Sequence, residues 1–276
     1  MNRIDQVFTQ LRAEPRAALM PYLPLGYPTL DVSRQLIRTV AGAGADLIEL
    51  GVPFSDPLAD GPVIQRATNV ALKNGITLAK CLEMTAAARA DGVTLPLILM
   101  GYYNPILRFG IEAFGRAARD AGADGLIVPD LPPEEAGTLN AACQAYDLDL
   151  IFLAAPTSTP ERLQKIAQAT RGFMYLVSVV GVTGAREQVA GDLSAFVARV
   201  RTVTNKPVCV GFGIANADSA RRVAQVADGV IVGSALVSRI DDPAHAVDAA
   251  RDFVGELRSA LEAESRSVVP STPTHS

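Results

Sequence analysis

Short apolar runs alternate with longer amphipathic runs along most of the chain. Eight of the short runs predict strands, and most are continuously apolar, which is typical of parallel strands buried on both faces. These predicted strands are Ala18–Leu25, Leu47–Gly51, Leu95–Gly101, Gly125–Pro129, Leu150–Leu153, Phe173–Val177, Pro207–Gly211 and Gly229–Val232.

The amphipathic runs between these strands predict helices. They are Asp31–Ala43, Thr77–Ala90, Ile111–Ala121, Pro133–Tyr146, Pro160–Ala169, Leu193–Val203 and Ala217–Val226. Pro133 and Pro160 suit the first turn of a helix, where the missing N–H costs nothing, and Asp31 and Asn216 suit N-cap positions. The pattern therefore predicts regular alternation of strand and helix.

A weak internal repeat supports a barrel. The string Ala-Asp-Gly-Leu-Ile-Val at residues 123–128 returns as Ala-Asp-Gly-Val-Ile-Val at 227–232, and Ala45-Asp46 precedes the second strand in the same way. The two longer copies are 104 residues apart, which is four units of 26. Eight strand–helix units in this length predict a (β/α)8 TIM barrel rather than a doubly wound sheet.

The two ends add to the barrel without adding a domain. Met1–Ala13 predicts an extra N-terminal helix with Ile4, Val7, Phe8 and Leu11 on one face, suited to closing the bottom of the barrel. Residues 265–276 are rich in Ser, Pro and Thr and are expected to be disordered. We expect a single domain over residues 1–264, with inserted helices.

The composition of the chain argues against nucleic acids and membranes as binding partners. Of the 276 residues, 49% are hydrophobic and 20% charged, and the net charge is −4. An acidic balance lacks the basic patch that nucleic-acid binding needs. No apolar run approaches the length of a membrane-spanning helix, and the N-terminus has no signal-peptide stretch. We therefore expect a cytoplasmic protein with neither nucleic acid nor a membrane as partner.

The rare residues limit the chemistry. Three isolated cysteines support neither a disulfide framework nor a thiolate zinc site, and two histidines are too few for a histidine-rich metal site. A nucleophile–histidine pair would have to use His245, which lies in a helical pattern. Only four lysines are present. Acid–base chemistry is therefore expected from carboxylates, tyrosines and backbone amides, without a metal or a cofactor.

Barrel active sites lie at the carboxyl ends of the strands, which directs attention to the end of the second strand. Glu49 alternates with Ile48 and Leu50 and is expected to point into the barrel, where burial would raise its pKa. Asp60 follows in the next loop, so the two carboxylates can form one acid–base site. The alternative is a structural Glu49 paired with an arginine. Candidate partners are Arg108, Arg171 and Arg186.

Glycines after the seventh and eighth strands predict a phosphate site. Gly211-Phe212-Gly213 and Gly233-Ser234 let backbone amides approach an anion, and a short helix beginning near Ser234 would point its N-terminus at the same place. A dinucleotide fingerprint is the weaker reading, because Asn216 replaces its third glycine and the motif follows the wrong strand.

The segment 178–187 after the sixth strand contains two glycines around Thr183, which suggests a mobile lid with the Gly184 amide facing phosphate. Three tyrosines, Tyr22, Tyr102 and Tyr175, lie at strand ends and with Phe212 could form an apolar pocket beside the phosphate site. For each tyrosine, core packing is the alternative.

Four motifs resemble those of the tryptophan synthase alpha subunit, over about residues 15–260. They are ELGVPFSDPLADGP at 49–62, GVTGA at 181–185, GFGI at 211–214 and GSA at 233–235. The resemblance implies a (β/α)8 lyase that cleaves indole-3-glycerol phosphate to indole and glyceraldehyde 3-phosphate. It also implies a complex, α2β2, with a pyridoxal-phosphate beta subunit.

The resemblance assigns roles by position. It implies that Glu49 is the general acid/base, Asp60 the second catalytic carboxylate, Tyr175 the support of Glu49 and Thr183 part of the closed lid. The implied phosphate ligands are Gly184, Gly213, Gly233 and Ser234, and the implied indole pocket is Tyr22, Met100, Tyr102, Ile127 and Phe212. The chain departs from some members at Tyr22, where phenylalanine is common, and in the proline-rich segment 129–132.

The residues and the resemblance agree on a mechanism. No lysine lies at the carboxyl end of a predicted strand, so a Schiff base is not indicated. The indole ring itself can accept the electrons once it is protonated at C3. Glu49 would deliver that proton and take one from the glycerol hydroxyl, while Asp60 would accept a hydrogen bond from the ring N–H.

Three other functions remain open on the sequence. Another phosphate-binding barrel, such as an aminoaldose-phosphate isomerase, shares the generic features but not the 49–62 motif. A stand-alone lyase that releases free indole would share every catalytic residue. An inactive subunit that activates a beta partner would not need intact Glu49 and Asp60. The loops at 53–56, 104–108 and 129–132 are the expected partner surface.

Overall fold

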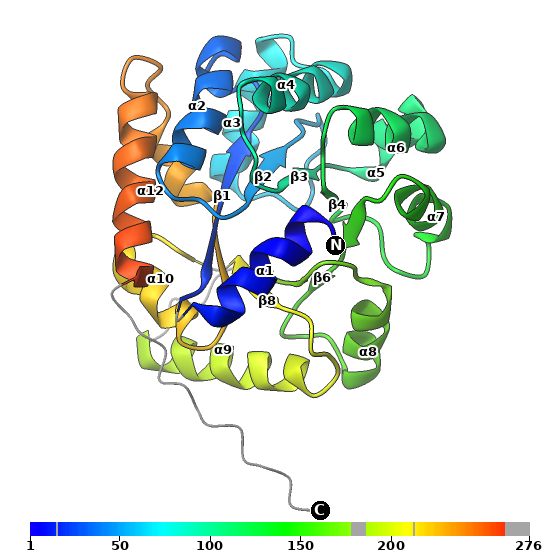
Figure 1. Cartoon of the computed structure of the whole chain (residues 1–276), viewed down its shortest axis with the longest axis vertical. Coiled ribbons are helices and arrows are strands. Elements are labelled where there is room, and N and C mark those ends of the chain that lie inside the picture. Colours follow the sequence, from blue (N-terminus) through cyan, green and yellow to red (C-terminus); the bar gives the residue numbers. More distant parts are fainter. Residues whose placement is uncertain (15, 178–185, 212, 263–276) are drawn as a thin grey trace, which may run out of the picture.

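A computed structural model describes residues 1–14, 16–177, 186–211 and 213–262. The predicted tail at 265–276 lies outside the described residues. Figure 1 shows a ring of helices around a central barrel of strands. The strands are β1 Ala18–Pro24, β2 Ile48–Gly51, β3 Leu97–Met100, β4 Gly125–Ile127, β5 Asp149–Ile151, β6 Leu153–Ala154, β7 Met174–Val177, β8 Val208–Gly211 and β9 Gly229–Val232.

The described helices follow the predicted alternation with strands. They are α1 Arg3–Ala13, α2 Leu30–Gly42, α3 Pro62–Lys73, α4 Leu78–Ala90, α5 Tyr103–Phe109, α6 Ile111–Asp120, α7 Gly137–Ala145, α8 Pro160–Ala169, α9 Arg186–Arg201, α10 Ala217–Ala224, α11 Ser234–Arg239 and α12 Ala246–Glu262. No helix in the described ranges combines the length and the apolar character needed to cross a membrane.

The strands pair in parallel in the order β5-β4-β3-β2-β1-β9-β8-β7-β6, so the sheet nearly closes on itself. Its two ends, β5 and β6, are consecutive in the chain and are separated only by Phe152. The Phe152 amide donates to the Thr170 hydroxyl at 3.3 Å instead of to a neighbouring strand. The predicted fifth strand is therefore split in two, and the predicted (β/α)8 TIM barrel is confirmed.

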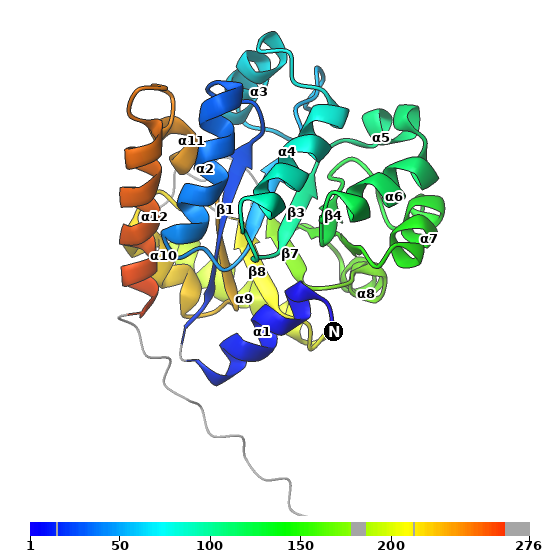
Figure 2. The same cartoon turned by 45° about the horizontal axis from the view of Figure 1, so that its top comes forward.

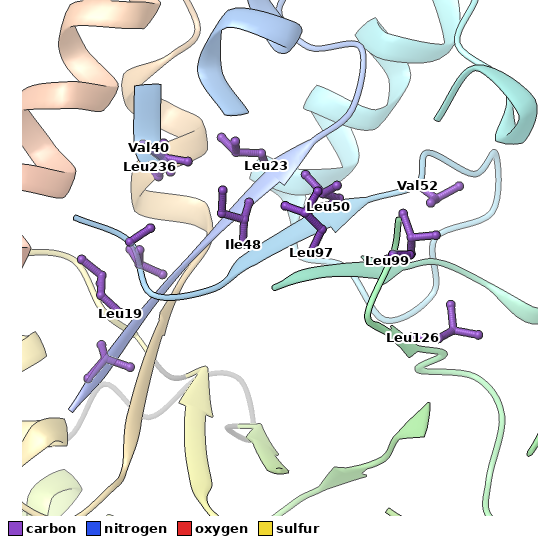
Figure 3. Packing of buried hydrophobic residues seen from close by; sticks show 14 of the residues in the cluster. Leu19, Leu23, Val40, Ile48, Leu50, Val52, Leu97, Leu99, Leu126 and Leu236 are labelled. Atoms are coloured by element: carbon purple, nitrogen blue, oxygen red, sulfur yellow. The ribbon is translucent and has the colours of Figure 1, made fainter. Parts of the chain in front are cut away.

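Alternate residues of each strand belong to two separate apolar layers. One layer faces the helices and includes Leu23, Ile48, Leu50 and Leu99, as Figure 3 shows. The other fills the barrel interior. Its members are Ala18, Met20, Leu47, Ile98, Ile127, Ile151, Phe173, Tyr175, Cys209 and Ile231, together with Ile4, Phe8 and Leu11 of α1. Burial on both faces explains the continuously apolar strands.

Helix α1 lies across the amino-terminal end of the barrel, as predicted (Figure 2). Ile4, Phe8 and Leu11 are buried, and the Phe8 ring lies 5.8 Å from the Phe173 ring between centroids. The Asn2 side chain donates to Asp149 and the Arg3 guanidinium to Asp124, each at 2.8 Å. The apolar face and these polar contacts together close the bottom of the barrel.

Two predicted helix starts are wrong. Pro133 lies in a turn closed by the Glu135 amide on the Pro132 carbonyl, and α7 begins only at Gly137. Asp31 lies in the first turn of α2, whose N-cap is Thr29, because the Thr29 hydroxyl accepts from the Val32 amide. The predictions for Pro160 and Asn216 are confirmed, the latter as part of a capping box.

The repeated Ala-Asp pair has a structural role at the bottom of the barrel. Asp46, Asp124 and Asp228 each accept a backbone hydrogen bond of 2.8 Å from the first or second residue of the preceding strand. The donors are the amides of Leu19, Leu97 and Val208. Each aspartate is also paired with an arginine. The repeat therefore marks strand-to-strand clamps far from the carboxyl ends of the strands.

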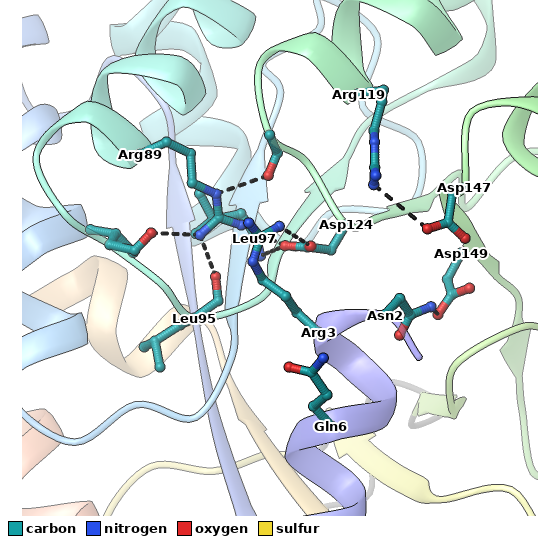
Figure 4. A network of polar contacts seen from close by, with 12 residues as sticks. Asn2, Arg3, Gln6, Arg89, Leu95, Leu97, Arg119, Asp124, Asp147 and Asp149 are labelled. Carbon is teal, nitrogen blue, oxygen red and sulfur yellow. Dashed lines mark hydrogen bonds and ion pairs between the residues drawn. The ribbon is translucent and has the colours of Figure 1, made fainter.

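Asp124 is the clamp that also holds helix α1 (Figure 4). Its side chain is 2% exposed and contacts Arg89 at 2.5 Å and Arg3 at 2.8 Å as well as the Leu97 amide. Arg89 also donates to the carbonyls of Leu95 and Gly122. One carboxylate thus joins α1, α4 and β3.

We expect Asp124→Ala to lower the unfolding free energy by about 3 kcal/mol, because it leaves a half-buried guanidinium and a buried amide unpaired. Urea unfolding at neutral pH measures this. The matched control is Asp248→Ala, whose side chain is 73% exposed and lies 2.6 Å from Arg251, and which should cost less than about 1 kcal/mol. Equal losses in the two variants would contradict the clamp.

Candidate active site

Glu49 is buried in the barrel interior with no ionic partner. It lies on β2 between Ile48 and Leu50, which face the helices, and its side chain is 0% exposed. Neither carboxyl oxygen has a hydrogen-bond partner among the described residues. The alternative of a structural ion pair is therefore wrong for Arg108 and Arg171, and Arg171 pairs with Asp149 and Asp147 instead. The Arg186 side chain lies outside the described part of the structure.

Burial has the expected effect on this carboxyl group. Desolvation, together with the nearby charge of Asp60, raises the pKa of Glu49 from its ordinary 4.5 to about 8, while the Tyr175 hydroxyl opposes the rise. At neutral pH Glu49 is thus predominantly protonated and can donate a proton. Such a carboxylic acid in a barrel interior is a typical general acid.

Asp60 lies in the loop between β2 and α3, near Glu49. Burial raises its pKa to about 6, opposed by a hydrogen bond from the Tyr102 hydroxyl. Asp60 is thus mostly ionised at neutral pH while Glu49 is mostly protonated. Two carboxyl groups whose environments separate their pKa values in this way can act as an acid and an anionic acceptor in the same site.

Tyr102 holds the loop that carries Asp60. Its hydroxyl accepts a hydrogen bond of 3.0 Å from the Ala59 amide, and its ring lies 5.4 Å from that of Phe54 between centroids. The loop is thus attached at both ends to a residue that follows β3. The sequence suggested only a pocket wall at Tyr102 and did not identify Phe54 as its partner, since neither contact is local in sequence.

Tyr22 and Tyr175 both lie near Glu49 in the barrel interior. The register pairs Tyr22 of β1 with Glu49 of β2, and Tyr175 of β7 with Cys209 of β8. Burial and neighbouring carboxylates raise the pKa of both hydroxyls well above 10, so both tyrosines remain neutral donors. The structure therefore brings both tyrosines to the two-carboxylate site.

The predicted phosphate side lies next to this pocket. Gly211 ends β8, Gly213 follows with a positive φ of 50°, and Gly233 precedes α11, which begins at Ser234 as predicted. A Cβ on Gly233 would lie 3.8 Å from the Tyr22 Cβ. The first turn of a helix leaves backbone N–H groups free to bind an anion, so this corner can receive a phosphate.

The remaining predicted site residues divide into two groups. Met100 and Ile127 pair in register at the ends of β3 and β4, and Ile127 belongs to the interior layer. Thr183, Gly184 and Phe212, and with them most of the predicted lid at 178–187, lie outside the described residues. Among the described residues, no three His, Cys, Asp or Glu side chains are grouped as a metal site requires.

A shallow hollow of about 500 Å³ lies beside the site. Its walls include Phe54, Asp56, Asn104 and Arg108, which belong to two of the three predicted partner loops. Leu58 is 92% exposed and Leu107 is 53% exposed nearby in sequence. Exposed apolar side chains around a hollow are typical of a protein-binding surface.

Asp130 connects the third partner loop to this surface. Its carboxylate accepts from the Tyr103 amide at 3.0 Å, at the first residue of α5. Asp130 thereby caps α5 from the loop that follows β4. The sequence did not identify this contact, because the two residues are 27 positions apart.

Comparison with known proteins points to one family. The family model described as tryptophan synthase alpha chain matches residues 8–265. The tryptophan synthase alpha chains of Roseiflexus sp. (strain RS-1) and Chloroflexus aurantiacus are 53% and 50% identical to it. The matches cover 94% and 95% of this chain and 100% and 99% of those proteins.

Solved structures agree with this match. Tryptophan synthase from Mycobacterium tuberculosis, in space group F222, superposes with a TM-score of 0.87 at 44% identity, covering 95% of this chain and 98% of that chain. The alpha subunit from Legionella pneumophila str. Paris superposes with a TM-score of 0.88 at 38% identity, covering 96% and 100%.

The buried carboxyl groups make stability depend on pH. The folded-state pKa values of Glu49 and Asp60 exceed their ordinary values, so the stability that the neutral forms provide is complete at low pH. It is lost as pH rises, between about 4 and 6 for Asp60 and between about 4.5 and 8 for Glu49. The unfolding free energy should therefore fall across this range.

We expect Glu49→Gln to remove the part of this fall that belongs to Glu49. At pH 9 the variant should be more stable than the parent chain by up to about 5 kcal/mol, since a pKa difference of one corresponds to about 1.4 kcal/mol. At pH 4 the two should differ little. Urea unfolding at both pH values measures this, with the exposed Glu135→Gln as the control. A parent chain with no pH dependence would show that Glu49 is not held neutral.

Proposed function

Because this chain belongs to the tryptophan synthase alpha chain family, and so cleaves indole-3-glycerol phosphate to indole and glyceraldehyde 3-phosphate, we propose that Glu49 and Asp60 carry out this cleavage. The observation that carries the proposal is the unpaired, fully buried carboxyl group of Glu49 beside the more exposed Asp60. The two groups hold different protonation states at neutral pH, as acid–base catalysis requires.

Glu49 acts first as an acid. Its proton goes to C3 of the indole ring, which forms an indolenine cation and makes the ring an electron acceptor. The resulting Glu49 carboxylate then takes the proton of the glycerol hydroxyl next to the ring. The bond between C3 and the glycerol chain breaks, its electron pair returns to the ring, and the hydroxyl carbon becomes the aldehyde of glyceraldehyde 3-phosphate. Glu49 ends protonated, ready for the next turnover.

Asp60 acts on the other side of the ring. Its carboxylate accepts a hydrogen bond from the indole N–H, where positive charge develops once C3 is protonated. The hydrogen bonds that Tyr102 makes to Asp60 and to the Ala59 amide hold this carboxylate in place. An ionised Asp60 therefore stabilises the cation more than it stabilises the substrate, and this difference accelerates the reaction.

No lysine is available to provide a Schiff base instead. Lys73 ends α3, Lys80 lies in α4 and Lys165 in α8. Lys206 precedes β8 at its amino-terminal end and donates to the Ala167 carbonyl. None of the four lysines lies on a strand, and none contributes to the pKa of Glu49 or Asp60, which supports the indole ring as the electron acceptor.

The rest of the predicted site follows from the same proposal. The phosphate binds to Gly213, Gly233 and Ser234 with Gly184, and Thr183 belongs to the lid that closes over it. The indole ring lies against the side chains at the mouth of the barrel, with Tyr175 supporting Glu49. These pocket residues are Tyr22, Met100, Tyr102, Ile127 and Phe212.

We further propose that the chain works as one domain, residues 1–264, in the cytoplasm and in an α2β2 complex with a tryptophan synthase beta subunit. Members of the family associate with a beta subunit, and the hollow beside Phe54, Asn104 and Arg108 supplies a matching surface. Phe54 contacts Tyr102, which holds the Asp60 loop. A partner seated there would therefore act on the catalytic loop through a single ring contact.

Glu49→Gln should reduce indole release from indole-3-glycerol phosphate by 10²- to 10⁴-fold, because glutamine keeps the shape but carries no acidic proton. Asp60→Asn should lower kcat by a similar factor through loss of the negative charge. Steady-state kinetics, monitored by indole formation, measure both. Glu135→Gln is the control and should retain the parent rate. Activity retained in Glu49→Gln would contradict the assignment.

Leu107→Asp should weaken association with a beta subunit at least tenfold, because it puts a charge on the exposed apolar face of α5. Co-elution and titration with the purified beta subunit measure this. Gln10→Asp, on the opposite end of the barrel, is the control. If the parent chain itself releases indole quickly and does not bind a beta subunit, the chain is a stand-alone lyase instead.

A further inference from the structure

The hydroxyl groups of Tyr22 and Tyr175 each lie directly over a glycine of the neighbouring strand. A Cβ on Gly51 would lie 2.2 Å from the Tyr22 hydroxyl, and a Cβ on Gly211 would lie 2.7 Å from the Tyr175 hydroxyl. Distances this short are impossible for a real side chain, so each hydroxyl occupies space that only glycine leaves open. The two pairs are equivalent: β1 with β2, and β7 with β8.

The register shows where the Tyr22 hydroxyl lies relative to Glu49. Tyr22 and Glu49 are direct partners on adjacent parallel strands, and both side chains point into the barrel. Gly51 lies two residues further along β2, on the same face and nearer to the carboxyl end. The Tyr22 hydroxyl, lying against Gly51, is therefore on the mouth side of Glu49, where substrate must approach.

No hydrogen bond satisfies the Glu49 carboxyl group in this structure, although the nearby Tyr175 hydroxyl lowers its pKa. Neither carboxyl oxygen of Glu49 has a partner within the described part of the chain. Among the same residues, no hydrogen bond involves the Tyr22 hydroxyl. Asp60 likewise has a hydroxyl nearby, that of Tyr102. The unpaired hydroxyl and the unpaired carboxyl group are thus complementary.

We infer that Tyr22 is a positioning residue for Glu49, whose hydroxyl donates a hydrogen bond to the Glu49 carboxylate during the reaction. This inference rests on the proposed role of Glu49. Proton transfer to the indole ring leaves a negative charge in the barrel interior, and an uncompensated buried carboxylate is costly. Tyr175 and Tyr22, both near Glu49, supply two donors for that charge.

The titratable groups that affect the pKa values of Tyr22, Glu49 and Tyr175 are carboxyl groups, tyrosine hydroxyls and thiols. Glu49 is on β2, Asp60 on the following loop, Tyr102 after β3 and Tyr175 on β7, with the thiols of Cys81 on α4 and Cys209 on β8 behind. No lysine or arginine contributes to the pKa of Glu49 or Tyr22. Among the residues that the structure describes, tyrosine hydroxyls are therefore the donors near the Glu49 carboxylate.

Tyr22→Phe tests the inference, because it removes the hydroxyl and keeps the ring. We expect kcat to fall about 10- to 100-fold with KM changed less than threefold. The loss of a donor to the charged form should also move the high-pH limb of the kcat profile upward by about one pH unit. Tyr175→Phe should change both in the same direction. Tyr146→Phe, directly after α7 and bonded to Glu112, is the control with unchanged kinetics.

A second measurement does not depend on activity. Tyr22→Phe should lower the melting temperature at pH 9, where Glu49 is charged, more than at pH 5, where it is neutral. In a Glu49→Gln background this difference between the two pH values should vanish. If it persists there and vanishes in an Asp60→Asn background, the hydroxyl serves Asp60 and the inference is wrong. Unchanged kinetics and stability in Tyr22→Phe would show that the residue only packs.

The outcomes separate this inference from the proposed function. If the parent chain is active and Glu49→Gln is inactive while Tyr22→Phe equals the parent, only the role of Tyr22 fails. If Glu49→Gln keeps the parent's activity, the proposed role of Glu49 fails, and the melting temperatures still report whether Tyr22 and Glu49 interact.

Discussion

A carboxyl group without a counter-ion in the interior of a parallel barrel is the constraint on which the rest of the site depends. Glu49 is fully buried and unpaired, and the cost of ionising it there raises its pKa to about 8. The barrel provides this environment, because alternate residues of its strands face an interior filled by Ile98, Ile127 and Ile151. A surface glutamate of the same sequence neighbourhood would be ionised and would have no proton to give.

The surrounding contacts limit how that carboxyl group can be used. Asp60 is less buried, and its bond with Tyr102 keeps its pKa lower, at about 6. The two acids therefore differ in charge at neutral pH although they share one site. Glycines at positions 51 and 211 leave room for the tyrosine hydroxyls beside them. The groups at the carboxyl end of the barrel thus control whether Glu49 holds or releases its proton.

The amino-terminal end of the same barrel has the opposite character. There every buried aspartate is paired, and Asp46, Asp124 and Asp228 join backbone amides to arginines. Helix α1 adds an apolar face to that end. Stability is concentrated at the bottom of the barrel, which lets the top hold an unpaired acid and an exposed, apolar surface near Leu58 and Leu107. This division is general in barrels of this class.

The sequence by itself determined the alternation of strands and helices, the inward direction of Glu49 and the glycines at the phosphate corner. Each of these follows from local periodicity or from a backbone requirement that a few neighbouring residues satisfy. Only the tertiary structure decided the split of the fifth strand at Phe152, the contact of Tyr102 with the Asp60 loop, the capping of α5 by Asp130 and the unpaired state of Glu49. Those depend on residues tens of positions apart, which come together only when the barrel closes and therefore leave no pattern in any one segment of the chain.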